Sequence, residues 1–180
     1  MEALAAVFTH KKREGKGYKM RRAIFVVAVA ALAAAFGAGP ASAANVRVGL
    51  ASCYFSHGGQ VTVPAGSTVT FFLGFVTISK GAAKSFEDAQ TTTATLNGSP
   101  VADASSLFAE PVQFGPQDWI APLFIPGGTL VNAGDQTTLS NLQVSLSHPV
   151  PSFDRSTQTQ GNYPAGDLLP AGFGCTVTAT

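Results

Sequence analysis

Residues 59–79 read GQVTVPAGSTVTFFLGFVTIS, and this stretch decides the fold class. It predicts two β-strands joined at 64–67, because Pro64 favours an extended residue before it and Gly66 accepts a positive φ. The β-branched and aromatic residues on either side favour a pleated, half-buried surface. The rest of the chain repeats short apolar runs separated by Pro, Gly and Asn, so we expect an all-β domain.

The second strand of this stretch changes its apolar phase near Gly74. Positions 69, 71, 73 and 75 are apolar in one parity, whereas Val76 and Ile78 belong to the other. A one-residue slip turns every side chain to the opposite face of a sheet. We therefore expect a β-bulge at Gly74, with both faces partly covered around Phe72. The alternative is a strand buried on both faces without a bulge.

An N-terminal leader over 1–43 precedes the folded part of the chain. Arg21 and Arg22 come before an apolar run over 23–36, and Ala41-Ser42-Ala43 follows. This order is typical of a secretory signal peptide, so we expect cleavage after Ala43 and a single secreted domain over 44–180. The apolar run of 14 residues is shorter than the roughly 20 that span a bilayer. A retained signal anchor is the alternative.

The residues before Met20 make an unusually long and basic start to a signal peptide, so Met20 is an alternative true start. The whole chain has a net charge of +1, but residues 44–180 carry four Lys or Arg against eight Asp or Glu, about −4. Such a sparse acidic surface argues against nucleic acid or an anionic membrane as a partner. After signal cleavage we expect no membrane contact. The sequence identifies no partner, and another extracellular or cell-envelope component is one candidate.

Local signals define several further elements. Apolar residues recur with helical spacing over 80–90, which predicts the one short helix of the domain. Asn97-Gly98 predicts a type I′ hairpin, and Pro100 places its returning arm at a sheet edge. Alternating apolar residues predict strands over 46–50, 142–146 and 173–177. The parity of the second of these strands turns His148 toward the core or its rim.

Two segments resemble loops in composition. Residues 112–126 are apolar but interrupted by Pro116 and Pro122, and residues 149–166 are rich in Pro, Ser, Thr, Gln and Gly. A loop of the second length is either functional or mobile. Seven or eight short strands with Pro- and Gly-rich corners therefore indicate a two-sheet β-sandwich, with a closed barrel as the alternative.

The rhythm of VTVPAGSTVTF at 61–71 and GFGCTVTAT at 172–180 resembles that of small secreted bacterial immunoglobulin-like domains. The likeness extends over most of 44–180 and implies an immunoglobulin-like sandwich with an extracellular binding or scaffolding role. The chain departs from the antibody pattern, because Trp119 lies 66 positions after Cys53 instead of about a dozen.

The two cysteines, Cys53 and Cys175, have no other pairing partner in the chain. In an exported domain such a pair is most simply a disulfide, and each cysteine lies in or beside a predicted strand. Free thiols and a metal site are the alternatives, but the sequence holds no CxxC motif or Cys/His cluster. We expect no metal and no cofactor.

Catalytic signals are sparse. His57 and His148 each follow a serine, but no G-x-S-x-G motif or other nucleophile signature accompanies them. Asp118 and Asp154 are isolated acidic residues, whereas a glycosidase needs two carboxylates that converge. Residues 154–158 have oxygen atoms at the spacing of a calcium loop but no closing Glu.

We therefore expect a non-enzymatic secreted or cell-envelope module that serves binding, adhesion or structure. Its working surface is predicted over 112–126 and 149–166, with Trp119, His148, Phe153 and Asp154 as candidate binding residues. A small secreted hydrolase or enzyme inhibitor that uses Asp118, His148 or Asp154 is the alternative.

The predicted cleavage after Ala43 can be tested directly. Export should release a chain that begins at Ala44, since signal peptidase cleaves after the A-x-A site. Sequencing the N-terminus of the secreted protein checks this, and a mature chain that still contains Phe25 would contradict it.

Overall fold

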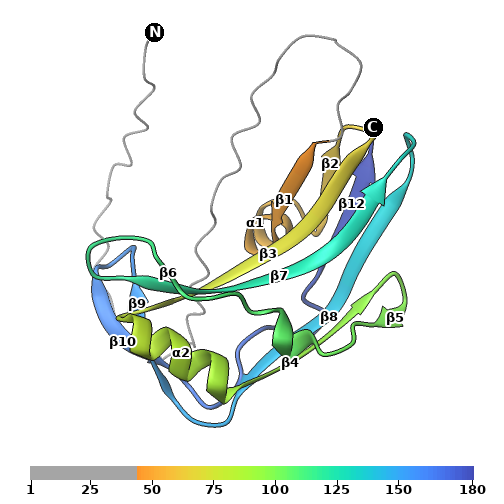
Figure 1. Cartoon of the computed structure of the whole chain (residues 1–180). Helices are drawn as coiled ribbons and strands as arrows, with labels where there is room; N and C mark the ends of the chain where they lie inside the picture. The colour runs from red at the N-terminus through yellow and green to blue at the C-terminus, as the bar shows by residue number, and fades with distance from the viewer. Residues whose placement is uncertain (1–43) are drawn as a thin grey trace, which may run out of the picture.

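The computed structural model describes residues 44–180, which form a mostly β-structure (Figure 1). The predicted signal peptide and the alternative start at Met20 lie outside the described residues. The strands are β1 Asn45–Gly49, β2 Gln60–Val63, β3 Ser67–Thr77, β4 Gln90–Leu96, β5 Ser99–Pro100, β6 Val112–Gln113, β7 Trp119–Leu130, β8 Gln136–Leu146, β9 Val150–Asp154, β10 Thr159–Tyr163, β11 Gly166–Asp167 and β12 Cys175–Ala179. The helices are α1 Leu50–Ser56, α2 Lys80–Ala89 and the short 3-10 helix η1 Ala104–Leu107.

The first sheet has the strand order β1-β3-β7-β6. Strands β3 and β7 form its centre and pair antiparallel from Ser67 opposite Leu130 to Thr77 opposite Trp119. Strand β1 adds a parallel neighbour to β3, and the two-residue β6 pairs with the start of β7. This long central pair positions the side chains on the outer face of the first sheet.

The second sheet has the order β2-β12-β8-β4-β5, and β11 pairs with β8. Strand β12 lies between β2, which is parallel to it, and β8, which is antiparallel. The third sheet is the hairpin β9–β10, which lies beside the end of β3 and near α2 (Figure 1). Helix α2 therefore closes the end of the domain where β3 finishes and β4 begins.

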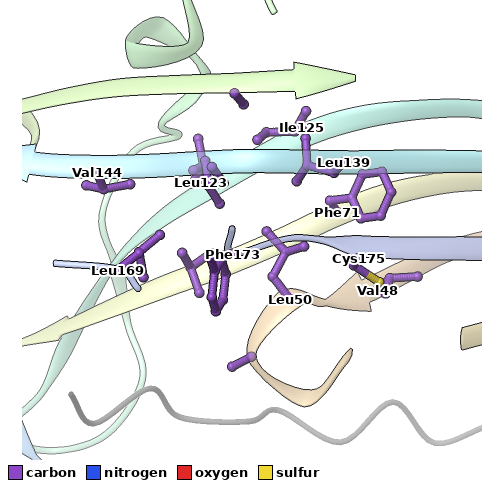
Figure 2. Packing of buried hydrophobic residues seen from close by; sticks show 14 of the residues in the cluster. Val48, Leu50, Phe71, Leu123, Ile125, Leu139, Val144, Leu169, Phe173 and Cys175 are labelled. Atoms are coloured by element: carbon purple, nitrogen blue, oxygen red, sulfur yellow. The ribbon is translucent and has the colours of Figure 1, made fainter. Parts of the chain in front are cut away.

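One hydrophobic core joins the two large sheets. Phe71 and Leu123 come from the first sheet, Leu139 and Val144 come from the second, and Phe173 precedes β12 (Figure 2). Each of these five side chains has 0% exposure. The alternating burial along β3 and β8 shows that both strands turn one face to this core. The expected all-β class is confirmed.

Several local predictions are confirmed. Helix α2 spans Lys80–Ala89, and the Ser79 side chain accepts a hydrogen bond from the backbone N–H of Ala82, which caps the helix. Asn97 and Gly98 have φ angles of 50° and 81°, as the type I′ turn requires, and Pro100 lies in the edge strand β5. The strands predicted near 142–146 and 173–177 are β8 and β12.

The region before Cys53 differs from the prediction. The first strand ends at Gly49, and Leu50 begins α1, so Cys53 lies in a helix of seven residues. The domain thus has a second short helix that the sequence analysis missed. Leu50, Ala51 and Cys53 are buried, since α1 packs this face against the core.

The predicted bulge at Gly74 was wrong. Gly74 pairs with Pro122 in continuous register, and the shift in this ladder lies between Val69 and Thr70. The apolar phase changes because Val76 is covered on its own face by a second small cluster, which also contains Phe153. The alternative of a strand covered on both faces therefore applies to this end of β3.

Both segments predicted as loops contain strands. Residues 119–130 form β7, in which Pro122 and Pro126 lie within a twelve-residue strand. Residues 149–166 contain the hairpin β9–β10, with Val150 and Phe153 buried. Polar and proline-rich composition concealed these strands, since tertiary packing against β3 outweighs the weak local propensity.

The predicted disulfide is confirmed. Cys53 in α1 and Cys175 at the start of β12 are bonded, with their Cα atoms 5.9 Å apart. This separation lies within the range that a disulfide needs. The bond fastens α1 to the second sheet across 122 positions of sequence.

Replacing Cys53 with Ser should lower the free energy of unfolding by a few kcal/mol. The chain-entropy model assigns roughly 5 kcal/mol to a loop of this length, because the bond restricts the unfolded chain. Urea unfolding monitored by circular dichroism measures the change against the oxidised wild type. A loss below about 1 kcal/mol, or two free thiols in the native secreted protein, would contradict the prediction.

Candidate functional site

An open apolar groove lies on the outer face of the first sheet, the face turned away from the main core. Its volume is about 400 Å³. Four strands contribute to it, and we call it the outer groove. It is lined by Arg47, Phe72, Val112, Phe114, Ile120, Pro122 and Phe124.

Strand alternation explains why these residues share one face. Phe71 and Leu73 of β3 point into the core, so the side chain of Phe72 between them points outward. Phe72 is opposite Phe124 of β7, and Gly74 is opposite Pro122. A Cβ atom at Gly74 would lie 2.9 Å from Ile120 Cγ2 and 3.2 Å from Phe72 Cζ. The absence of a side chain at Gly74 therefore leaves space for the side chains of Ile120 and Phe72, which line the outer groove.

Arg47 and two phenylalanines form a continuous stack at one side of the groove. The ring centroids of Phe72 and Phe124 are 5.2 Å apart, and the guanidinium carbon of Arg47 lies 5.2 Å from the centroid of Phe124. Arg47 reaches this place from β1, because the parallel pairing sets it opposite Thr70 on the outer face. The contact has cation–π geometry.

A second arginine stacks at the opposite side. The guanidinium carbon of Arg155, in the β9–β10 turn, lies 4.2 Å from the centroid of Phe114. Its Nε atom is 2.9 Å from Oδ2 of the buried Asp118. A side chain at Gly115 would collide with the Asp118 carboxylate, so glycine makes room for this ion pair. The pair fixes the hairpin beside Phe114.

The hairpin β9–β10 is anchored at two further points. Phe153 packs with Val76 and Ile120 in the second cluster, which covers one end of the outer face of the sheet. The backbone N–H of Val76 donates a hydrogen bond of 2.9 Å to the hydroxyl oxygen of Tyr163. Burial raises the pKa of the Tyr163 phenol, so this side chain is neutral across the physiological range.

The four predicted binding residues do not form one exposed patch. Trp119 is half-buried against the main core, on the opposite face of β7 from Ile120, and Lys80 Nζ lies 5.9 Å from its ring centroid. Phe153 is buried in the second cluster. Asp154 is the last residue of β9, and His148 follows β8.

Asp154 has a structural role in its turn. Its Oδ1 atom accepts hydrogen bonds from the Ser156 hydroxyl at 2.7 Å and the Ser156 backbone N–H at 2.8 Å. These bonds, the hydroxyl bond foremost, hold the pKa of the carboxyl group below its usual value. No group of three or more His, Cys, Asp or Glu side chains within 44–180 is arranged to hold a metal ion.

The expected orientation of His148 was wrong. Strand β8 ends at Leu146, so the alternation stops before His148, whose side chain is exposed. Its Nδ1 atom lies 3.1 Å from the Ser147 hydroxyl. Asp118 lines a pocket of about 210 Å³ together with Phe153 and Arg155, and neither His148 nor Asp154 lines that pocket. The three residues of the predicted hydrolase therefore do not meet there.

Phe114 and Phe124, which belong to the predicted segment 112–126, line the outer groove, whereas the earlier Phe108 packs against Phe75 and Phe86. Two groove residues, Arg47 and Phe72, lie outside the surface predicted from sequence. The parity of β3 already pointed Phe72 outward. The position of Arg47 depends on the parallel pairing of β1 with β3, which has no local signal.

Comparisons with protein-family models, with curated proteins and with solved structures gave no match. Within the described part of the chain, no helix has the length and apolar character needed to span a membrane.

Replacing Arg155 with Met should lower the free energy of unfolding by about 3 kcal/mol, because the buried Asp118 carboxylate then has no counter-ion. Chemical denaturation measures this loss. Lys84→Met on the exposed face of α2 is the matched control and should change stability by less than about 0.5 kcal/mol. The double variant Asp118→Leu with Arg155→Met should recover part of the loss, and equal effects of Arg155→Met and Lys84→Met would contradict the prediction.

Proposed function

We propose that this chain is an exported, non-enzymatic binding module of the immunoglobulin-like type, and that the outer groove is its binding site. The observation that supports this proposal most strongly is the apolar groove itself, because it lies on a sheet face that is turned toward solvent.

The outer face of an antiparallel sheet is normally polar when the inner face packs on the core. Here Phe72, Ile120, Pro122 and Phe124 occupy that face, and the rim adds Val112 and Phe114, with 56% and 41% of their surface exposed. Phe72 and Phe124 are half-buried, whereas Ile120 and Pro122 are buried. Single exposed apolar residues need no explanation, but apolar residues that together line an open groove are typical of an interaction site.

The groove also overlaps the surface predicted from sequence. Five of its seven lining residues belong to 112–126, and Arg155 of the other predicted segment stacks on Phe114. Its volume falls within the range of small-molecule sites, which are mostly apolar with a few polar groups.

The strand order supports the immunoglobulin-like assignment. That fold places strands A, B, E and D in one sheet and C, F and G in the other. The order β1-β3-β7-β6 corresponds to A-B-E-D, and β12-β8-β4 corresponds to G-F-C. Two features depart from the antibody pattern: β1 is parallel to β3, and the disulfide joins α1 to β12 instead of joining the B and F strands.

The disulfide also supports export. Structural disulfides are typical of proteins in oxidising compartments and rare in the cytosol. The described residues contain no free cysteine. Together with the signal-peptide pattern in the sequence, this favours a secreted or cell-envelope location.

The neutral apolar dye Nile red tests the binding site. The wild-type protein should bind it with a rise in fluorescence, and Val112→Glu should weaken binding about ten-fold or more, since a carboxylate on the groove wall disfavours an apolar ligand. Val131→Glu is the matched control, because Val131 is 65% exposed and does not line the groove.

Circular dichroism verifies that both variants fold. Absence of dye binding to the wild type, or equal effects of the two variants, would contradict the proposal.

A further inference from the structure

We propose that the outer groove binds a small amphiphile with a carboxylate at one end, and that Arg47 holds the carboxylate while Phe72 and Phe124 cover the apolar body. This inference rests on the proposed function and names the ligand class of the same site.

The distribution of positive charge over the domain is the main support for this inference. Residues 44–180 hold only four Lys or Arg side chains against eight acidic ones. Two of these four, Arg47 and Arg155, stack on the groove phenylalanines, and no acidic residue lines the groove. An acidic domain that gathers half of its cations at its apolar groove is complementary to a ligand that is apolar and anionic.

The two arginines differ in whether a carboxylate neutralises their charge. Arg155 is neutralised by Asp118, and this is the one ion pair found among the described residues. Arg47 therefore has no carboxylate partner there, and its side chain is exposed on β1. The charge available to a ligand is that of Arg47.

The contact of Arg47 with Phe124 leaves its hydrogen-bonding groups available. The guanidinium carbon lies over the ring, 5.2 Å from its centroid, and the side chain is exposed, so its N–H donors remain accessible to a ligand. The edge of a guanidinium matches the two oxygen atoms of a carboxylate, which accept parallel hydrogen bonds. The phenylalanine stack beneath keeps the guanidinium at the wall of the groove.

The size and lining of the groove favour a single small molecule over a polymer. A volume of about 400 Å³ accommodates a short acyl chain or a compact aromatic acid. Apart from Arg47, every lining residue is apolar, so the body of the ligand has no hydrogen-bonding partner among the side chains. An alkyl chain satisfies this condition, and a sugar or a peptide backbone does not.

Isothermal titration calorimetry with three matched probes tests the inference. Laurate, dodecanol and dodecyltrimethylammonium share one alkyl chain and differ in charge. Below their micellar concentrations and at low salt, laurate should bind about ten-fold or more tightly than dodecanol, since a charge-assisted hydrogen bond adds to the apolar contact. The cationic probe should bind more weakly than dodecanol.

Three variants test whether Arg47 causes the preference for laurate. Arg47→Gln should remove most of the laurate preference and leave dodecanol binding within about two-fold. Lys84→Gln, which removes the same charge from the exposed face of α2, should leave the binding of both probes unchanged. Arg47→Lys keeps the charge but lacks the planar edge, so it should retain only part of the preference.

The outcomes separate the two proposals. Equal affinity for laurate and dodecanol, or an unaltered preference in Arg47→Gln, would overturn the assignment of a carboxylate ligand while the groove remains a binding site. Failure of Nile red and all three probes would overturn the proposed function itself. Sedimentation with vesicles of phosphatidylcholine and phosphatidylglycerol, without binding of monomeric laurate, would overturn the small-molecule site in favour of a membrane surface.

Discussion

The antiparallel pairing of β3 with β7 is the constraint on which the other features depend. It extends over all eleven residues of β3, and its register decides which side chains face the core and which face outward. Phe71 and Leu123 meet the second sheet on one face, and Phe72 and Phe124 form the outer groove on the other. A slip of one residue would place Phe72 in the core and expose Phe71, so the core and the groove have a common origin.

The parts of the fold that could be predicted are those with a local cause. The turn at Asn97-Gly98 requires two positive φ angles, α2 has apolar residues at helical spacing, and β8 alternates regularly from Leu142 to Leu146. The disulfide followed from the count of two cysteines. Helix α1 had no such signal, because it is short and has no side-chain cap, and it is stabilised by packing and by the bond at Cys53.

Only part of the candidate site could be predicted from the sequence, for a related reason. Composition directed attention to 112–126, which supplies one wall of the groove, but the other wall comes from Phe72 and Arg47, far earlier in the chain. Their proximity follows from the pairing of β1, β3 and β7, a long-range property that no short window of sequence contains. Trp119 and Phe153 attracted notice as large aromatic residues, yet packing uses both, one against each face of the sheet.

The prolines of β7 have a consequence for how the protein meets other chains. The carbonyl oxygen of Pro122 accepts a hydrogen bond from the backbone N–H of Ala109, so the nitrogen of Pro122 also faces away from β3. Pro126 has the same parity, and β6 pairs only with Trp119 and Ile120. At this border of the sheet, two of the outward-facing positions, Pro122 and Pro126, therefore have no N–H group. A strand that paired here would have fewer hydrogen-bond donors available. Addition of a further strand is thus disfavoured at this border of the first sheet, whereas the outer face of the same sheet remains accessible to solvent.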